Sequence, residues 1–184
     1  MNITLAILLV LVLGFLFLQR SRLSFVSQQP TEYDATGPGF NIMQHFSGPI
    51  KCEGVIFGPT GRMAGRFVAD MRGKWNGQEG LLAENFTYAT GAKQQREWRL
   101  KMGANGQFTA TADDVIGVAQ GQQSGATVRM TYRLKLDEDA GGHVLDVTDW
   151  MYLLEDGSIM NKSEMRKYGV KVAELIATMH PEAA

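Results

Sequence analysis

Alternation of apolar and polar residues with a period of two recurs from residue 40 almost to the C-terminus, and it constrains the fold more than any other feature. In the clearest run, charged and polar residues separate Val128, Met130, Tyr132, Leu134 and Leu136. Successive side chains of a β-strand point to opposite faces, so this run predicts a strand with one face on a core and one in water.

Similar runs surround Phe67, Trp98 and Phe108, and glycine-containing or polar turns at 90–93, 103–106 and 137–142 separate several of them. A meander of consecutive antiparallel strands commonly closes into a barrel, which removes its exposed edges. We therefore predict a mainly β domain, an antiparallel up-and-down barrel over residues 40–179. Two segments stay open: 40–46, with His45, fits a short helical lid or a first strand, and 170–177 fits an amphipathic helix or a closing strand, which we favour.

An apolar run precedes this domain and occupies residues 1–18. A helix over 3–18 would be roughly 24 Å long, slightly short of a hydrocarbon core of about 30 Å, and Arg20 and Arg22 can extend to the headgroups. A cleaved signal peptide is the alternative, but a basic start and small residues at a cleavage point are missing. We predict a single transmembrane anchor at 1–18, an extended stem at 19–39 and a short tail at 180–184.

Arg20 and Arg22 on the domain side of this run favour a cytoplasmic domain by the positive-inside rule, with the periplasmic side as the alternative. The formal net charge is only −1, which gives no reason to expect nucleic acid as a partner. The one cysteine, Cys52, excludes an internal disulfide. Scattered histidines predict no metal site, and we expect no cofactor and no catalytic residues, because no nucleophile, base and orienting group can be assembled.

Four charged residues interrupt the apolar faces of the predicted strands: Glu84, Arg96, Asp114 and Asp149. Each shares its alternation with apolar neighbours and is therefore expected to point into the barrel. Two interpretations follow. The first is a structural ion pair, for example Arg96 bridging Asp149 and Glu84. The second is a hydrated pocket for an amphiphilic or cationic ligand, because three carboxylates and one guanidinium are hard to bury dry.

The leading functional hypothesis is a membrane-anchored, non-enzymatic barrel that binds a small apolar or amphiphilic molecule, such as a lipid or a quinone. It predicts a cavity lined by Phe67, Phe86, Trp98, Phe108, Met130, Tyr132 and Met151. The alternative is an accessory or assembly subunit of a larger membrane complex, with a barrel filled by its own side chains.

Several longer motifs carry a family resemblance: EGVIFGPTGRMAGRFVADMRGKW, REWRL, TADDVIGVAQG, MTYRLKL and DVTDWMYLLEDGSIMNKSEMRKYGVKVAE. Together they resemble the bacterial family known as Domain of Unknown Function 3833, over residues 30–179. The positions that match the family pattern are Arg96, Trp98, Asp114, Gly117, Asp149, Trp150, Asn161 and Gly169.

This resemblance implies a lipocalin-like barrel and a bacterial origin, and it implies no activity. With the predicted anchor at 1–18, the expected location is the bacterial inner membrane. Many members look like lipoproteins, whereas here no cysteine follows the apolar run. A transmembrane anchor would then replace the lipid.

Overall fold

The computed structural model describes residues 3, 5, 7–12, 14 and 23–182. Residues 7–12 are helical, and among the described residues no helix is both long enough and apolar enough to cross a membrane. The predicted anchor at 1–18 lies partly outside the described residues, as do Arg20 and Arg22, so the transmembrane helix stays a prediction.

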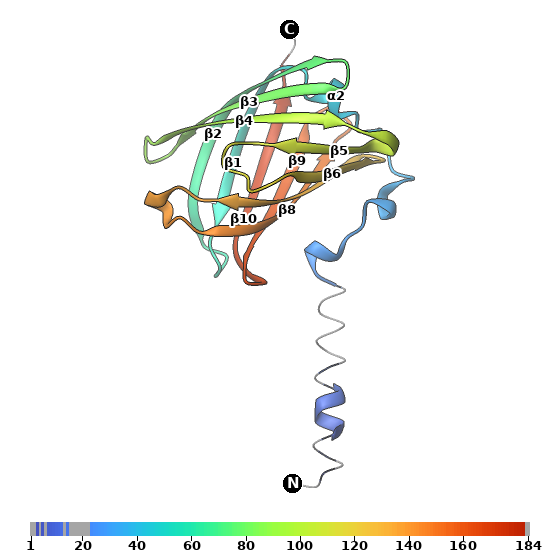
Figure 1. Ribbon diagram of the computed structural model, residues 1–184, viewed down its shortest axis with the longest axis vertical. Coiled ribbons are helices and arrows are strands. Elements are labelled where there is room, and N and C mark those ends of the chain that lie inside the picture. The colour runs from blue at the N-terminus through green and yellow to red at the C-terminus, as the bar shows by residue number, and fades with distance from the viewer. Residues whose placement is uncertain (1–2, 4, 6, 13, 15–22, 183–184) are drawn as a thin grey trace.

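In the described part of the chain, ten antiparallel strands form one closed barrel (Figure 1). Their order around the barrel follows the chain, and β1 pairs with β10 to close it. This confirms the prediction of a mainly β, up-and-down barrel. The strands are β1 (Gly48–Phe57), β2 (Met63–Asn76), β3 (Glu79–Tyr88), β4 (Lys93–Met102), β5 (Gln107–Thr111), β6 (Ala119–Ser124), β7 (Thr127–Lys135), β8 (Val144–Leu153), β9 (Ile159–Lys167) and β10 (Val170–Pro181).

The strands carry the predicted alternation into the core. On β7, Val128, Met130 and Leu134 are buried inside the barrel, whereas Arg133 between them is exposed. Burying a large apolar side chain contributes about 1.5–3 kcal/mol, so a strand shifted by one residue would lose this stabilisation along its whole length. The pattern of apolar residues therefore sets which face of each strand points inward.

A short helix, α2 (Ile42–His45), closes one end of the barrel. Ile42 is 1% exposed, and Phe46 directly after the helix is also buried. The Trp75 Nε1–H donates a hydrogen bond to the carbonyl oxygen of Phe46 at 3.0 Å, which ties the helix to β2. Gly73 makes this approach possible, because a Cβ there would lie 1.6 Å from the same oxygen. Of the two alternatives for residues 40–46, the structure has the helical lid.

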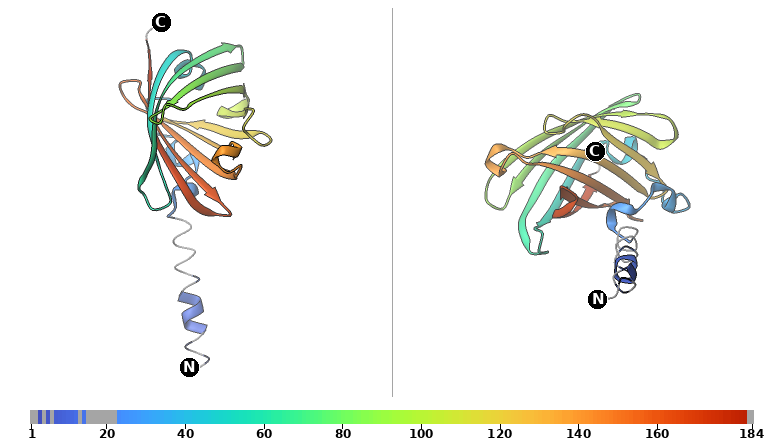
Figure 2. Two further views of the ribbon diagram at one scale, coloured as in Figure 1. Left: turned by 90° about the vertical axis from the view of Figure 1, so that its left-hand side faces the viewer. Right: turned by 60° about the horizontal axis from the view of Figure 1, so that its bottom comes forward.

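The segment that carries the short 3-10 helix η2 (Pro30–Tyr33) lies against the outside of the barrel, as the two views in Figure 2 also show. Another short 3-10 helix, η1 (Phe25–Ser27), precedes it. The Tyr33 ring lies 5.2 Å from the ring of Trp150, an outward residue of β8 that is fully buried. Residues 25–39 are thus not a simple extended stem, because Trp150 requires an apolar cover on the outer face.

At the other end of the chain, residues 170–181 form β10, in agreement with the favoured strand interpretation. The strand continues to Pro181, so it includes the first residues of the predicted tail. Two further 3-10 turns, η3 (Ala104–Gly106) and η4 (Glu138–Ala140), lie in the connections between β4 and β5 and between β7 and β8.

Candidate functional site

A cavity of about 630 Å³ occupies the barrel interior. The inward residues of the strands line it, and it ends at Ile42 and Phe46 beside the α2 lid. Towards the opposite end, residues of the β3–β4 and β7–β8 connections, including Ala92 and Ala140, complete the wall. The lining includes every residue proposed from sequence for an apolar wall: Phe67, Phe86, Trp98, Phe108, Met130, Tyr132 and Met151.

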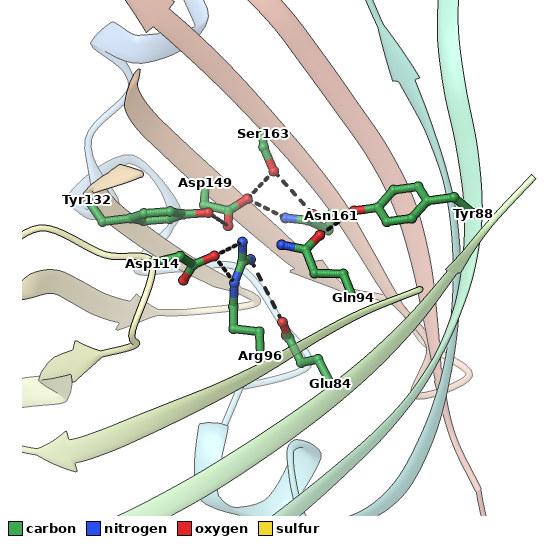
Figure 3. A network of polar contacts seen from close by, with 9 residues as sticks. All are labelled: Glu84, Tyr88, Gln94, Arg96, Asp114, Tyr132, Asp149, Asn161 and Ser163. Carbon is green, nitrogen blue, oxygen red and sulfur yellow. Dashed lines mark hydrogen bonds and ion pairs between the residues drawn. The ribbon is translucent and has the colours of Figure 1, made fainter. Parts of the chain in front are cut away.

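The four charged residues that interrupt the apolar faces also line this cavity. Glu84 and Arg96 are direct cross-strand partners on β3 and β4. Asp114 lies in the loop after β5. Strand β7 holds this loop in place, because the backbone N–H of Lys135 donates a hydrogen bond of 2.8 Å to the carbonyl oxygen of Asp114. Figure 3 shows the carboxylates of Glu84 and Asp114 on either side of the Arg96 guanidinium.

Arg96 is committed mainly to Asp114. Its Nε and Nη2 donate hydrogen bonds of 2.8 and 2.6 Å to the same carboxylate oxygen, Oδ2. Its Nη1 lies 3.9 Å from Oε2 of Glu84, which is an ion pair without a hydrogen bond. The guanidinium carbon also lies 5.7 Å from the centre of the Trp98 ring, a distance suited to a cation–π contact.

Asp149 has different partners from those expected. Asn161 donates from Nδ2 to its Oδ1 at 2.7 Å, the Ser163 hydroxyl donates to the same oxygen, and the Tyr132 hydroxyl lies 3.5 Å from Oδ2. The predicted ion pair between Arg96 and Asp149 is therefore wrong, because Arg96 pairs with Asp114 instead. The loop that carries Asp114 brings this carboxylate to Arg96, while β9 supplies neutral donors to Asp149.

Two buried carboxylate oxygens in this cluster have no hydrogen-bond partner among the residues that the structure describes: Oε2 of Glu84 and Oδ1 of Asp114. Both atoms are buried, and Glu84 as a whole is only 8% exposed. A buried acceptor without a donor costs about 1–3 kcal/mol. The site therefore contains acceptors for donors that the surrounding side chains do not supply.

Burial also alters the acidities of these groups. It raises the pKa of Glu84 to about 7, although the positive charge of Arg96 opposes the shift. Burial likewise raises the pKa of Asp149, against the hydrogen bonds from Ser163 and Asn161. Burial of Arg96 alone would lower its pKa, but the charges around it, that of Glu84 foremost, raise it overall, so Arg96 remains a cation.

Asn161 and Ser163 belong to the site but were not predicted as parts of the polar cluster, although Asn161 matches the family pattern. Both are buried and lie on the inward face of β9 with Ile159, so the same reasoning that selected Asp149 would have found them. Tyr88 and Gln94 were also missed; the Tyr88 hydroxyl donates to Gln94 Oε1 at 2.7 Å in the cavity wall (Figure 3).

Cys52 lies in the cavity wall and is 4% exposed. Burial raises the pKa of its thiol to about 12, with smaller contributions from Glu84 and Glu53. Among the residues that the structure describes, no three His, Cys, Asp or Glu side chains are grouped so as to hold a metal ion.

Comparisons with known proteins extend this description. The model of a family described as "Protein of unknown function (DUF3833)" matches residues 21–181. No curated protein matches the chain. Among solved structures, the S-type phycobiliprotein lyase CPES from Guillardia theta is similar, with a TM-score of 0.59 and 7% sequence identity, over 78% of this chain and 92% of that one. At this identity the similarity concerns the barrel fold alone.

Proposed function

This chain belongs to the family of proteins of unknown function DUF3833, whose name supplies no activity, and we therefore propose a function from the cavity itself. We propose that the protein is a non-enzymatic binding protein that holds one small apolar or amphiphilic molecule, such as a lipid, inside its barrel. The observation that carries the proposal is the cavity between the α2 lid and the β3–β4 and β7–β8 connections.

The size and lining of the cavity suit such a ligand. Sites for small molecules typically measure about 300–1,000 Å³ and combine an apolar wall with a few polar groups. Here aromatic and methionine side chains form most of the wall, and the polar groups gather around Arg96. An eight-stranded barrel already encloses one small ligand, and this barrel has ten strands in its described part.

The alternative function, an accessory or assembly subunit of a larger membrane complex, predicts a barrel filled by its own side chains. A cavity of about 630 Å³ favours the binding function over that alternative. Interior packing in proteins otherwise leaves few voids larger than a water molecule, so a space of this size is unusual unless something occupies it.

The test is to ask what the full-length protein carries from its own membrane. The protein is extracted with a styrene–maleic acid copolymer, which avoids detergent in the cavity, and its bound small molecules are identified by mass spectrometry. Ala173→Trp places a large ring in the cavity wall on β10 and should remove the bound molecule. Ala83→Trp, on the outward face of β3, is the control.

A molecule retained in stoichiometric amount by the native protein and the Ala83→Trp control, and lost from Ala173→Trp, is the expected result. Equal small-molecule content in all three proteins would mean that the molecules come from the surrounding membrane and that the cavity holds none of them.

Membrane anchoring is part of the same proposal. Its support is the apolar run at 1–18 together with the exposure of its described side chains, such as Ile3 (80%), Val10 (68%) and Leu11 (64%). Such an array of exposed aliphatic side chains requires an apolar environment. Arg20 and Arg22 favour a cytoplasmic domain in the bacterial inner membrane over a periplasmic one.

Alkaline carbonate extraction tests the anchor, and protease accessibility in spheroplasts tests the side. An anchored protein stays in the carbonate-resistant pellet, and replacing Leu8, Leu9 and Leu11 by Lys should release it. A cytoplasmic domain is protected from protease added outside spheroplasts, whereas a periplasmic domain is cleaved.

A further inference from the structure

We propose that the ligand of this cavity is an amphiphile with a primary ammonium head group, which donates hydrogen bonds to Glu84 and Asp114 while its apolar chain lies along the aromatic wall. The inference rests on the proposed function, since it assigns the chemical class of the molecule that the barrel holds. Its evidence is independent of the cavity volume and comes from the charges and unmet hydrogen bonds of the polar cluster.

The charge of the cluster favours a cation. Glu84, Asp114 and Asp149 contribute three carboxyl groups, and Arg96 is the basic residue of the polar network in Figure 3. Lys93 and Lys135 also line the cavity but do not belong to that network. Arg96 and Asp114 neutralise each other through two hydrogen bonds. Asp149 receives its hydrogen bonds from neutral donors, so with Asp149 ionised the four charged residues of the polar cluster keep a net negative charge even when Glu84 binds a proton.

The same contacts disfavour an anionic head group. A carboxylate or phosphate ligand would need free donors, and the Arg96 fork already donates from Nε and Nη2 to Asp114. The third nitrogen, Nη1, faces Glu84. An anion that took the Nε and Nη2 donors would displace Asp114 and leave its buried carboxylate without a partner, which is strongly unfavourable. An anion that used Nη1 instead would lie beside the carboxylate of Glu84 and meet like-charge repulsion.

The acceptor oxygens without a hydrogen bond indicate that the head group of the ligand carries hydrogen-bond donors. Oε2 of Glu84 and Oδ1 of Asp114 are buried acceptors without a hydrogen bond, on residues that flank Arg96 (Figure 3). An ammonium group carries three N–H donors, enough for both oxygens. A quaternary ammonium has the charge without the donors, and an alcohol has one donor without the charge, so neither satisfies both requirements.

The apolar wall accounts for the rest of the molecule. Trp98 lies two residues from Arg96 on the same face of β4. Its ring makes an edge-to-face contact with the ring of Tyr132, with 5.2 Å between the ring centres. Phe67 and Phe86 lie beside each other in the wall, with their ring centres 5.3 Å apart, and the wall ends at Ile42 of α2. A chain that starts at the carboxylates has an apolar surface to follow towards the lid.

The test compares four probes with the same chain: octylamine, octyltrimethylammonium, octanol and octanoate. Each is titrated into the full-length protein in a non-ionic amphipol, and binding is followed by Trp98 fluorescence. The Trp98→Phe protein gives the background from Trp75, Trp150 and partition into the polymer. We expect octylamine to bind at least about tenfold more tightly than each other probe, the ratio that one charge-assisted hydrogen bond provides.

Near-isosteric variants locate the preference. Glu84→Gln and Asp114→Asn each keep the side-chain shape but remove a carboxylate, and each should reduce the preference for octylamine. Asp113→Asn and Glu97→Gln are matched controls, because Asp113 adjoins Asp114 and Glu97 adjoins Arg96 but both point outward. These controls should bind octylamine like the native protein, and circular dichroism checks that every variant is folded.

The outcomes separate this inference from the function on which it rests. If all four probes bind with similar affinity, the barrel binds amphiphiles and the ammonium assignment is wrong. If octylamine is preferred but the preference survives both Glu84→Gln and Asp114→Asn, the head group is not where we place it. If none of the probes binds, the proposed function itself fails.

Discussion

Arg96 donates two hydrogen bonds to a single oxygen of Asp114 and leaves the other oxygen, Oδ1, buried and without a partner. This one-sided pairing joins the loop after β5 to strand β4 inside the barrel. It uses two of the N–H donors of Arg96 and one of the two carboxylate oxygens of Asp114. The same relationship therefore contributes to stability and leaves an acceptor for a ligand.

Removing the cation should destabilise the domain strongly. In Arg96→Met the carboxylates of Asp114 and Glu84 lose their shared counter-charge inside the barrel, and we expect the unfolding free energy to fall by about 3–5 kcal/mol. Urea unfolding followed by far-UV circular dichroism measures it. Arg99→Met is the matched control: Arg99 pairs with Asp113 on the outer face at 3.1 Å, and losing that exposed pair should cost at most about 1 kcal/mol.

Arg96→Met combined with Asp114→Asn should recover part of the lost stability, because the second change removes one of the buried charges. If Arg96→Met and Arg99→Met were equally mild, the interior ion pair would contribute no more than a surface one.

Glu84 should make stability depend on pH. Its pKa is about 7 in the folded protein, against 4.5 for an unperturbed glutamate. The folded state thus holds this proton more tightly, so the contribution of Glu84 is fully present below about pH 4.5 and is lost as the pH rises through 7. The difference between the folded and unperturbed pKa values of Glu84 corresponds to about 3 kcal/mol of unfolding free energy.

Urea unfolding at pH 5, 6, 7 and 8 checks this. Relative to the native protein, Glu84→Gln should gain unfolding free energy as the pH rises, while Glu97→Gln on the outer face should show no such trend. A flat difference for Glu84→Gln would mean that the carboxyl titrates normally. The titratable groups that act on Glu84 or respond to it are Cys52, Tyr88, Arg96, Asp114, Tyr132 and Asp149.

Gly73 should be sensitive to the smallest possible side chain. In Gly73→Ala the new methyl group would meet the Phe46 carbonyl, so β2 and the α2 lid must separate, at a cost of about 1–3 kcal/mol. Thermal unfolding measures the loss, and fluorescence from Trp75 reports whether its hydrogen bond to Phe46 is broken. Gly65→Ala on the same strand has open space around the new Cβ and should be close to neutral.

Cys52 should be inert in the folded protein. A pKa of about 12 lies three units above the usual 9.0, so the reactive thiolate is about a thousandfold scarcer at pH 8. We expect iodoacetamide to leave the native protein unmodified over hours and to label Cys52 rapidly in urea, as measured by intact mass. Fast labelling without urea would show that the cavity wall opens readily at β1.

The fold class followed from the sequence because side-chain alternation is a local property. Polar residues between Val128, Met130 and Leu134 identify a strand and its inward face without any knowledge of its neighbours. The same logic placed Glu84, Arg96, Asp114 and Asp149 on inward strand faces, and the structure puts all four in the wall of one cavity. For Asp114 the predicted strand was wrong, because β5 ends at Thr111 and Asp114 reaches the cavity from the following loop. Alternation says which face a residue occupies, but it does not say which residue lies across from it.

Only the tertiary structure decided the partners, because they depend on strand register and on loops. Arg96 meets Asp114 because backbone contacts hold the 112–118 loop beside β7, whereas Asp149 faces Ser163 through the β8–β9 register. Tyr33 covers Trp150, and α2 closes one end, through contacts between segments far apart in the chain. Many such contacts together also decide whether side chains fill the barrel interior. The sequence by itself determined a barrel with charges inside, and three-dimensional packing decided that these charges surround a cavity with unmet hydrogen-bond acceptors.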